Sequence, residues 1–221
     1  MTDDADDPHD LFPDGFFSRS DESDDSDFYR PERLVTHIDD RAIGAVGDLY
    51  SELAISGSVL DLMSSWISHF QVAPKELVLL GMNERELRSN QMATGIVVHD
   101  LNKNPVLPFP DARFDAATCC VSIDYLVRPI DVLRECGRVV RPGGPVVCTF
   151  SNRCFPTKVI RGWLGLDEPG RCALVAEYMK LAGLTDIAWS LRTPRDGVRG
   201  MHGVHGDPLY AVVGRVGTVA G

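Results

Sequence analysis

The segment 59-VLDLMSSWISHF-70 joins an apolar run to an acid, a short polar turn and a helix-like stretch. This order is typical of the start of an α/β domain that binds a nucleotide. The turn in such domains is normally rich in glycine, because the backbone has to come close to the ligand. Here the turn is Met63, Ser64 and Ser65. The segment therefore raises the question of whether a binding turn has changed its chemistry or lost its function.

Apolar runs and helical patterns alternate on both sides of this segment. Helices are predicted over 31–53 (one or two), 66–70, 83–92, 129–140 and 170–183. Strands are predicted at 59–62, 76–81, 95–100, 114–123, 145–150, 184–191 and 208–216. The alternation predicts an α/β, Rossmann-like fold whose seven-stranded sheet is mostly parallel, with helices on both faces. No helix separates the last two strands, which predicts an antiparallel C-terminal hairpin.

The acidity of the chain is concentrated at its N-terminus. The net charge is −10, and residues 1–27 hold eleven Asp or Glu and one Arg, so this segment carries all of it. The composition predicts a disordered acidic tail over 1–27 and a folded domain over 28–221. In an alternative interpretation, part of the tail binds a protein partner through an apolar motif, namely Leu11, Phe12, Phe16 and Phe17.

Several classes of protein do not fit this sequence. The chain has no basic stripe of the kind that binds nucleic acid, and no apolar run as long as the roughly 18 residues of a membrane helix. Its acidic N-terminus does not resemble a signal peptide, so we expect a cytoplasmic protein. The six cysteines form no CxxC pair, which favours buried free thiols over a metal site.

Four pieces of sequence, in order, carry a family resemblance. They are VLDL (59–62), LLGMN (79–83), HDLNKNPVLPFPDARFDAA (99–117) and VLRECGRVVRPGGPVVCTF (132–150). Together they resemble the class I S-adenosylmethionine-dependent methyltransferases of the type-11 kind, over roughly residues 58–216. The stretch LPFPDARFD is similar to the family's LPF-x-D-x-x-FD, and LRECGRVVRPGG to its helix followed by R-x-L-x-P-G-G.

The resemblance implies an S-adenosylmethionine site built from the ends of the first three strands. Asp61 is expected near the amino-acid end of the cofactor. Asn83, with Glu84 beside it, stands where the family has an acid that accepts from the ribose hydroxyls. Asp100 is expected to face the adenine amine, and Leu101 the adenine ring.

The turn after the first strand departs from the family, which has G-x-G-x-G there. Met63 and Ile67 would intrude on the ligand unless the turn is reshaped. Ser64 and Ser65 could instead cap a following helix and bind a carboxylate at its positive end. Both a reshaped site and a filled one are therefore open. Ser122, after the fourth strand, completes the expected cofactor contacts.

Candidates for chemistry lie beyond the carboxyl ends of the strands. Asp124 and Tyr125 are the expected substrate contact or base, although a helix cap and a core tyrosine would explain them equally. Further substrate contacts are expected from the N-terminal region, from the segment after the fifth strand and from the late glycine-rich loop: Tyr29, Arg33, His37, Asn152, Arg153 and His202. The loop residues could equally be solvated.

The sequence thus predicts a methyltransferase that uses S-adenosylmethionine and acts on a small-molecule substrate, without metal. The alternative is a non-catalytic member of the fold that acts through protein contacts. A nicotinamide-binding protein fits less well, because the LPFPDARFD and RPGG pieces match the methyltransferase pattern. The substrate, the acceptor atom and the oligomeric state do not follow from the sequence.

Overall fold

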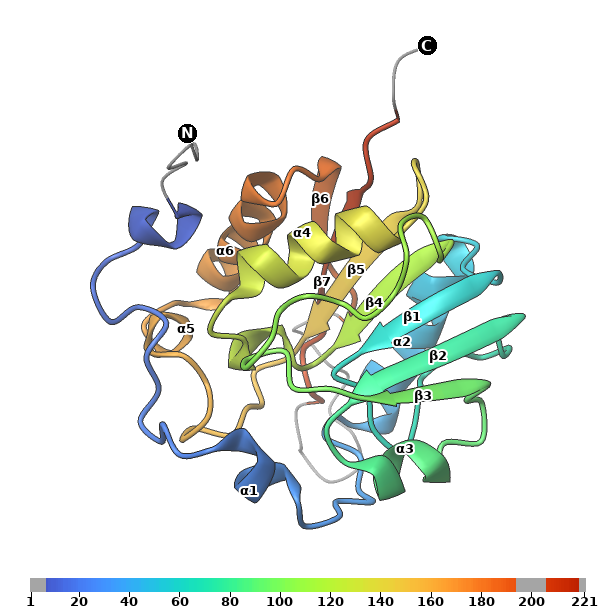
Figure 1. Cartoon of the computed structure of the whole chain (residues 1–221), viewed down its shortest axis with the longest axis horizontal. Helices are drawn as coiled ribbons and strands as arrows, with labels where there is room; N and C mark the ends of the chain where they lie inside the picture. Colours follow the sequence, from blue (N-terminus) through green and yellow to red (C-terminus); the bar gives the residue numbers. More distant parts are fainter. Residues whose placement is uncertain (1–6, 194–205, 219–221) are drawn as a thin grey trace.

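The computed structural model describes residues 7–193 and 206–218. Its centre is one seven-stranded sheet in the order β3-β2-β1-β4-β5-β7-β6 (Figure 1). Strands β1 to β5 pair in parallel, whereas β7 runs antiparallel to both β5 and β6. The predicted sheet and its C-terminal hairpin are confirmed. The strands are β1 (Ser58–Leu62), β2 (Glu76–Gly81), β3 (Gly95–Val98), β4 (Ala116–Cys120), β5 (Pro145–Phe150), β6 (Thr185–Leu191) and β7 (Tyr210–Arg215).

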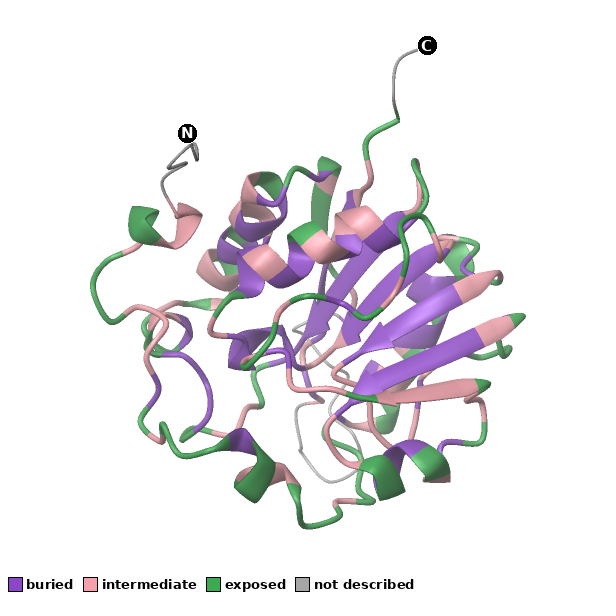
Figure 2. Cartoon of the chain, viewed as in Figure 1, coloured by how far each residue is buried: buried purple, intermediate pink, exposed green. Residues whose placement is uncertain are grey.

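Helices cover both faces of this sheet. They are α1 (Asp25–Tyr29), α2 (Asp40–Glu52), α3 (Glu84–Ser89), α4 (Pro129–Val139), α5 (Arg161–Leu164) and α6 (Glu168–Leu181), with 3-10 turns η1 (Pro8–Leu11) and η2 (Ile123–Tyr125). Successive strand residues point to opposite faces. Leu60 therefore joins the apolar cluster with α4 and α6, whereas Val59 joins the cluster with α2. Figure 2 shows this burial along the central strands. No helix in the described residues is long and apolar enough to cross a membrane.

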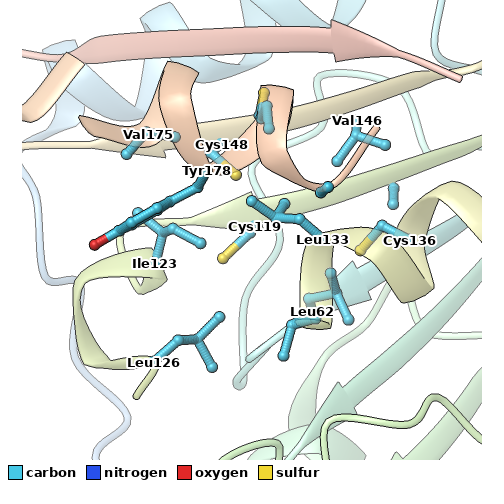
Figure 3. Close-up of a cluster of buried hydrophobic side chains, with 14 of the residues drawn as sticks. Leu62, Cys119, Ile123, Leu126, Leu133, Cys136, Val146, Cys148, Val175 and Tyr178 are labelled. Atoms are coloured by element: carbon cyan, nitrogen blue, oxygen red, sulfur yellow. The ribbon is translucent and has the colours of Figure 1, made fainter. Parts of the chain in front are cut away.

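The cluster under α4 and α6 contains several of the cysteines (Figure 3). All six cysteines are free thiols, and Cys119, Cys136 and Cys148 are buried among leucine, valine and isoleucine side chains. Burial raises the pKa of the Cys136 thiol. A protonated thiol in an apolar setting packs as a small apolar group, as predicted for these residues.

The helix predicted over residues 66–70 is absent, and this part of the prediction was wrong. An irregular loop over residues 63–75 joins β1 to β2. The Asp61 carboxylate at the end of β1 accepts hydrogen bonds from Ser64 Oγ at 2.7 Å and Ser68 Oγ at 2.8 Å. These bonds draw the loop back onto the strand end. Ser64 and Ser65 consequently have no helix to cap.

Residues 7–27 also differ from the predicted disordered tail, while residues 1–6 lie outside the described residues. The segment runs along the outside of the domain and packs against it (Figure 1). Phe12 and Phe17 both contact the ring of Tyr178 in α6, with centroid distances of 5.6 and 6.0 Å. Phe16 packs against Gly162. Three of the four apolar residues expected to bind a partner are thus used within the chain, and only Leu11 is largely exposed.

Buried charges hold the second half of this segment in place. Asp25 accepts from Arg19 at 2.8 Å and lies 3.1 Å from the Nζ atom of Lys158. Its other oxygen accepts from Asn102 Nδ2 at 2.8 Å. Composition alone predicted disorder because it counts acids without showing that some meet specific cationic partners from the domain.

Candidate functional site

A cavity of about 150 Å³ lies at the carboxyl ends of β1 to β4. Its floor is formed by the segments that follow these strands, and the N-terminal segment 25–37 covers it. Of the residues that the sequence assigned to the cofactor, eight line it: Asp61, Met63, Ser64, Ser65, Asn83, Asp100, Leu101 and Ser122. The topology of a parallel sheet explains this gathering, because the carboxyl ends of its strands share one edge.

The turn after β1 contains no glycine, yet its backbone lies close to the backbone of β2. Met63 has a φ of 50°, a left-handed conformation that side chains other than glycine adopt at a cost. The Ser64 N–H donates to the Leu80 carbonyl at 2.9 Å. A Cβ atom on Gly81 would lie 2.4 Å from the Ser64 carbonyl oxygen. The required glycine is therefore Gly81 on β2, a residue to which the sequence analysis gave no role.

Asp61 organises this turn. Besides Ser64 and Ser68, it accepts a hydrogen bond from Thr118 Oγ1 at 2.8 Å. Burial raises the pKa of the Asp61 carboxyl, and the three hydroxyl donors act in the opposite direction. The carboxylate therefore holds the loop against β1 and β4, in addition to lining the cavity.

Glu86 in α3 is a cavity residue that the sequence analysis missed. Its Oε2 atom accepts from Ser65 Oγ at 2.6 Å, and its Oε1 atom accepts from the Arg33 backbone N–H at 2.7 Å. It therefore joins the loop after β1 to the N-terminal segment. The available signal was its position in the first turn of the helix that follows β2, on the side of the helix that faces the strand end.

Asn83 lines the cavity, but its amide is fully engaged. Oδ1 accepts from the backbone N–H groups of Arg85 and Glu86 and so caps α3. Nδ2 donates to the carbonyls of Tyr29 and Arg30. Glu84, the second residue expected to face a ribose, does not line the cavity.

The Glu84 side chain points to solvent instead. It accepts two hydrogen bonds from Arg88 along the surface of α3. Its expected role at the ribose is therefore corrected, because successive side chains of a helix point in different directions and that of Glu84 lies along the surface, beside Arg88.

Asp100 presents an oxygen with no hydrogen-bond partner. Oδ1 accepts from the backbone N–H groups of Asn102 and Lys103. Oδ2 is buried without a hydrogen bond, and the nearest cation, Lys103 Nζ, is 3.8 Å away. His69, on the same cavity, has a buried Nδ1 atom in the same condition, and burial lowers its pKa. A buried polar atom without a partner is costly, and here two of them belong to residues that line one cavity.

The expected catalytic pair is split by the structure. Tyr125 lines the cavity, and its hydroxyl accepts from the Phe155 backbone N–H at 2.8 Å. Asp124 does not line the cavity. Its carboxyl is buried beside Tyr125, and burial raises its pKa to about 7. An aspartate that is not on the cavity wall cannot take a proton from a molecule inside it, so its expected contact with substrate is corrected.

The expected substrate residues also divide. Tyr29, Arg33 and His37 line the cavity, whereas Asn152 and Arg153 do not. Arg153 donates instead to Asp207 at 2.6 Å, and the Asn152 amide oxygen accepts from its neighbour Ser151. His202 lies outside the described residues.

The central part of the chain is similar in sequence to known proteins. A family model described as "Methyltransferase domain" matches residues 64–148. The chain is 28% identical over 129 residues to a Ubiquinone biosynthesis O-methyltransferase of Proteus mirabilis, covering 56% of this chain and 49% of that protein. It is 36% identical over 75 residues to a Demethylmenaquinone methyltransferase of a Geobacillus species, covering 34% of this chain and 31% of the relative. The chain thus spans at most about half the length of these relatives.

Solved structures share the fold at low sequence identity. The [4+2]-cyclase SpnF superposes with a TM-score of 0.59 at 15% identity, over 86% of this chain and 90% of that one. A SAM-dependent methyltransferase from Archaeoglobus fulgidus gives a TM-score of 0.57 at 14% identity, over 79% and 94%. At this identity the likeness shows the fold, and the fold is shared by an enzyme named as a cyclase.

Proposed function

We propose that this chain is a class I S-adenosylmethionine-dependent methyltransferase, which binds S-adenosylmethionine in the cavity and methylates a small molecule. The family-model match over residues 64–148 and the methyltransferases among its relatives support this proposal. The observation that carries the proposal is that Asp100 lines the cavity while its buried Oδ2 atom has no hydrogen-bond partner in the described chain. An exocyclic amine, such as that of adenine, supplies the missing donor. Leu101, the next residue, offers an apolar surface for the ring.

The residues at the other strand ends fit the rest of the cofactor. We propose that Glu86 takes the ribose hydroxyls, because the Asn83 amide is already engaged and each Glu86 oxygen accepts only one hydrogen bond. A carboxylate oxygen has two lone pairs, so acceptor capacity remains on both. Gly81 keeps the loop close to β2 there. Bound S-adenosylmethionine would supply an electrophilic methyl group.

The protein's own contribution to methyl transfer would be positioning and exclusion of water. The N-terminal segment covers the cavity, and Tyr125 lies on its wall with a hydroxyl fixed by the Phe155 N–H. Because that hydroxyl accepts from the backbone, its own proton is available for an acceptor molecule. We therefore propose Tyr125, and not Asp124, as the polar contact to the substrate.

A small-molecule substrate is proposed from the cavity and the relatives. The cavity lies between the loop after β1 and the segment 25–37, which both line it. Relatives bear the names of methyltransferases of ubiquinone biosynthesis and of demethylmenaquinone. The non-catalytic alternative finds no support among them. Met63, whose side chain was the expected obstacle, packs partly against the core while it lines the cavity.

Calorimetric titration of the purified chain with S-adenosylhomocysteine and S-adenosylmethionine tests the proposal. We expect saturable binding that Asp100→Asn weakens by about tenfold or more, because the new amide NH₂ would face a donor where a charged acceptor stood. Glu84→Gln is the matched control, since Glu84 was expected at the ribose but does not line the cavity. Absence of heat with either ligand at millimolar concentration would overturn the proposal.

A further inference from the structure

Arg33 is the only lysine or arginine among the described residues that line the cavity. No Asp or Glu in the described part of the chain forms an ion pair with its guanidinium; the Glu86 carboxylate accepts only from its backbone N–H. The guanidinium donates to two carbonyls, those of Phe28 at 2.8 Å and Pro31 at 3.2 Å. A guanidinium has five N–H groups, so three of them have no acceptor in the described chain.

Aromatic rings fix the orientation of this cation. Its central carbon lies 4.6 Å from the ring centroid of Phe28 and 5.7 Å from that of Phe155. Stacking on aromatic faces occupies the faces of a guanidinium and leaves its N–H edges for hydrogen bonds. Two of the guanidinium N–H groups are bound to backbone carbonyls, so the remaining N–H groups are held in a fixed orientation, ready to bind an acceptor. Planar bidentate acceptors, above all carboxylates, match such an edge.

The backbone N–H of Arg33 donates to Glu86, a proposed cofactor contact, whereas its guanidinium lies over the rings of Phe28 and Phe155. The other proposed cofactor contacts come from the ends of β1, β2 and β3, whereas Phe155 follows β5. The nearby wall is aromatic: Tyr29, His37 and Tyr125 line it together with Phe155. Two acids of the cavity wall lie near this part of it: Glu86 accepts from the Arg33 backbone N–H, and Asp25 is paired with Arg19 and Lys158. A second ligand at this end would therefore meet one free cation and several ring faces.

We propose that Arg33 determines substrate specificity by binding a carboxylate, so that the methyl acceptor is an acid with a planar, unsaturated body. The planar body would lie against the rings of Phe155 and Tyr125, and the acid would take the free edge of Arg33. This inference rests on the proposed function for the reaction, but binding of an acid at Arg33 can be measured without turnover.

The test compares acids with their uncharged amides on the full chain. Ligand-observed NMR titrations would use benzoate against benzamide and 4-hydroxybenzoate against 4-hydroxybenzamide, each with saturating S-adenosylhomocysteine. We expect the wild type to prefer the acids by roughly tenfold, the value of one charge-assisted hydrogen-bond pair. Arg33→Gln should abolish the preference and Arg33→Lys should restore part of it. Arg30→Gln is the matched control, because Arg30 lies on the same segment and is exposed.

A second arm separates the cofactor's own carboxylate from that of the acceptor. S-adenosylhomocysteine is compared with 5′-methylthioadenosine, which lacks the amino-acid group. If Arg33→Gln weakens only S-adenosylhomocysteine and leaves the acid preference intact, Arg33 binds the cofactor and the proposal is overturned. An acid preference that is absent in the wild type also overturns it. If the wild type binds neither nucleoside, the proposed function fails. The acid and amide titrations are then repeated without nucleoside. A preference of the wild type for the acids that is lost in Arg33→Gln would still support the inference, and its absence would overturn it.

Discussion

The Nζ atom of Lys158 lies 3.1 Å from the Oδ1 atom of Asp25, and both side chains are buried. The two residues are far apart in the sequence: Lys158 lies in the loop after β5, and Asp25 lies in the acidic N-terminal segment. Asp25 also lines the cavity. The contact therefore ties the segment that covers the proposed site to the domain beneath it.

Replacing Asp25 by Asn should destabilise the protein strongly. Removing one partner of a buried pair typically costs about 3–5 kcal/mol; Asp21 and Glu22, which are more exposed, would remain near Lys158 and Arg19. Here Lys158 and Arg19 would both lose this partner. Urea denaturation would measure the free energy of unfolding. Asp27→Asn is the control, because that acid is exposed and its pair with Arg30 should contribute less than about 1 kcal/mol.

The same variant reports on the N-terminal segment. Limited proteolysis should cut residues 7–27 faster in Asp25→Asn than in the wild type or in Asp27→Asn. Equal stability and equal cleavage in all three proteins would show that the segment does not depend on the buried pair.

Stability should fall as pH rises from about 4 to about 7 because of Asp124. Burial raises the pKa of this carboxyl from 3.8 to about 7. Between these values the folded state binds the proton and the unfolded state does not, so its contribution to stability is largest below pH 4 and is lost as pH rises through 7. Asp124→Asn cannot ionise. Its free energy of unfolding should equal that of the wild type near pH 4. At pH 8 it should be higher than that of the wild type by a few kcal/mol, the order of magnitude that such a pKa shift implies.

Denaturation curves for both proteins from pH 4 to 8 would measure this difference. A difference in unfolding free energy that does not change with pH would contradict the raised pKa. The comparison also bears on the site, since an acid buried outside the cavity should affect stability more than ligand binding.

Met63→Gly should strengthen binding of S-adenosylhomocysteine several-fold. The substitution removes a side chain that lines the cavity and relieves the positive φ of 50°. Lost packing against the core offsets the relief, so the unfolding free energy should change by no more than about 1 kcal/mol. Ala112→Gly is the matched control, because Ala112 also has a positive φ (49°) but is not on the cavity wall. Weaker binding in Met63→Gly would mean that Met63 supports the ligand.

Part of the site could be predicted because strand ends are predictable. Asp61 lies at the end of β1 and Asp100 shortly after β3, and a parallel sheet brings such positions to one edge. The residues placed wrongly, such as Glu84 and Asp124, sit on helical turns. On a helical turn, neighbouring side chains point in directions about 100° apart. The sequence pattern does not fix the start of such a turn to within one residue, so it does not predict which of two neighbours faces the cavity.

The sequence by itself determined the sheet of this protein, including its final hairpin, because alternating strand and helix patterns permit few arrangements. Only the tertiary structure decided which polar groups remain free to bind. Asn83 and Asp61 use their oxygens within the chain, Asp100 keeps one, and Arg33 keeps part of its guanidinium edge. The N-terminal segment folded for the same reason: hydrogen bonds and ion pairs form between groups far apart in the sequence, and composition does not record which groups meet.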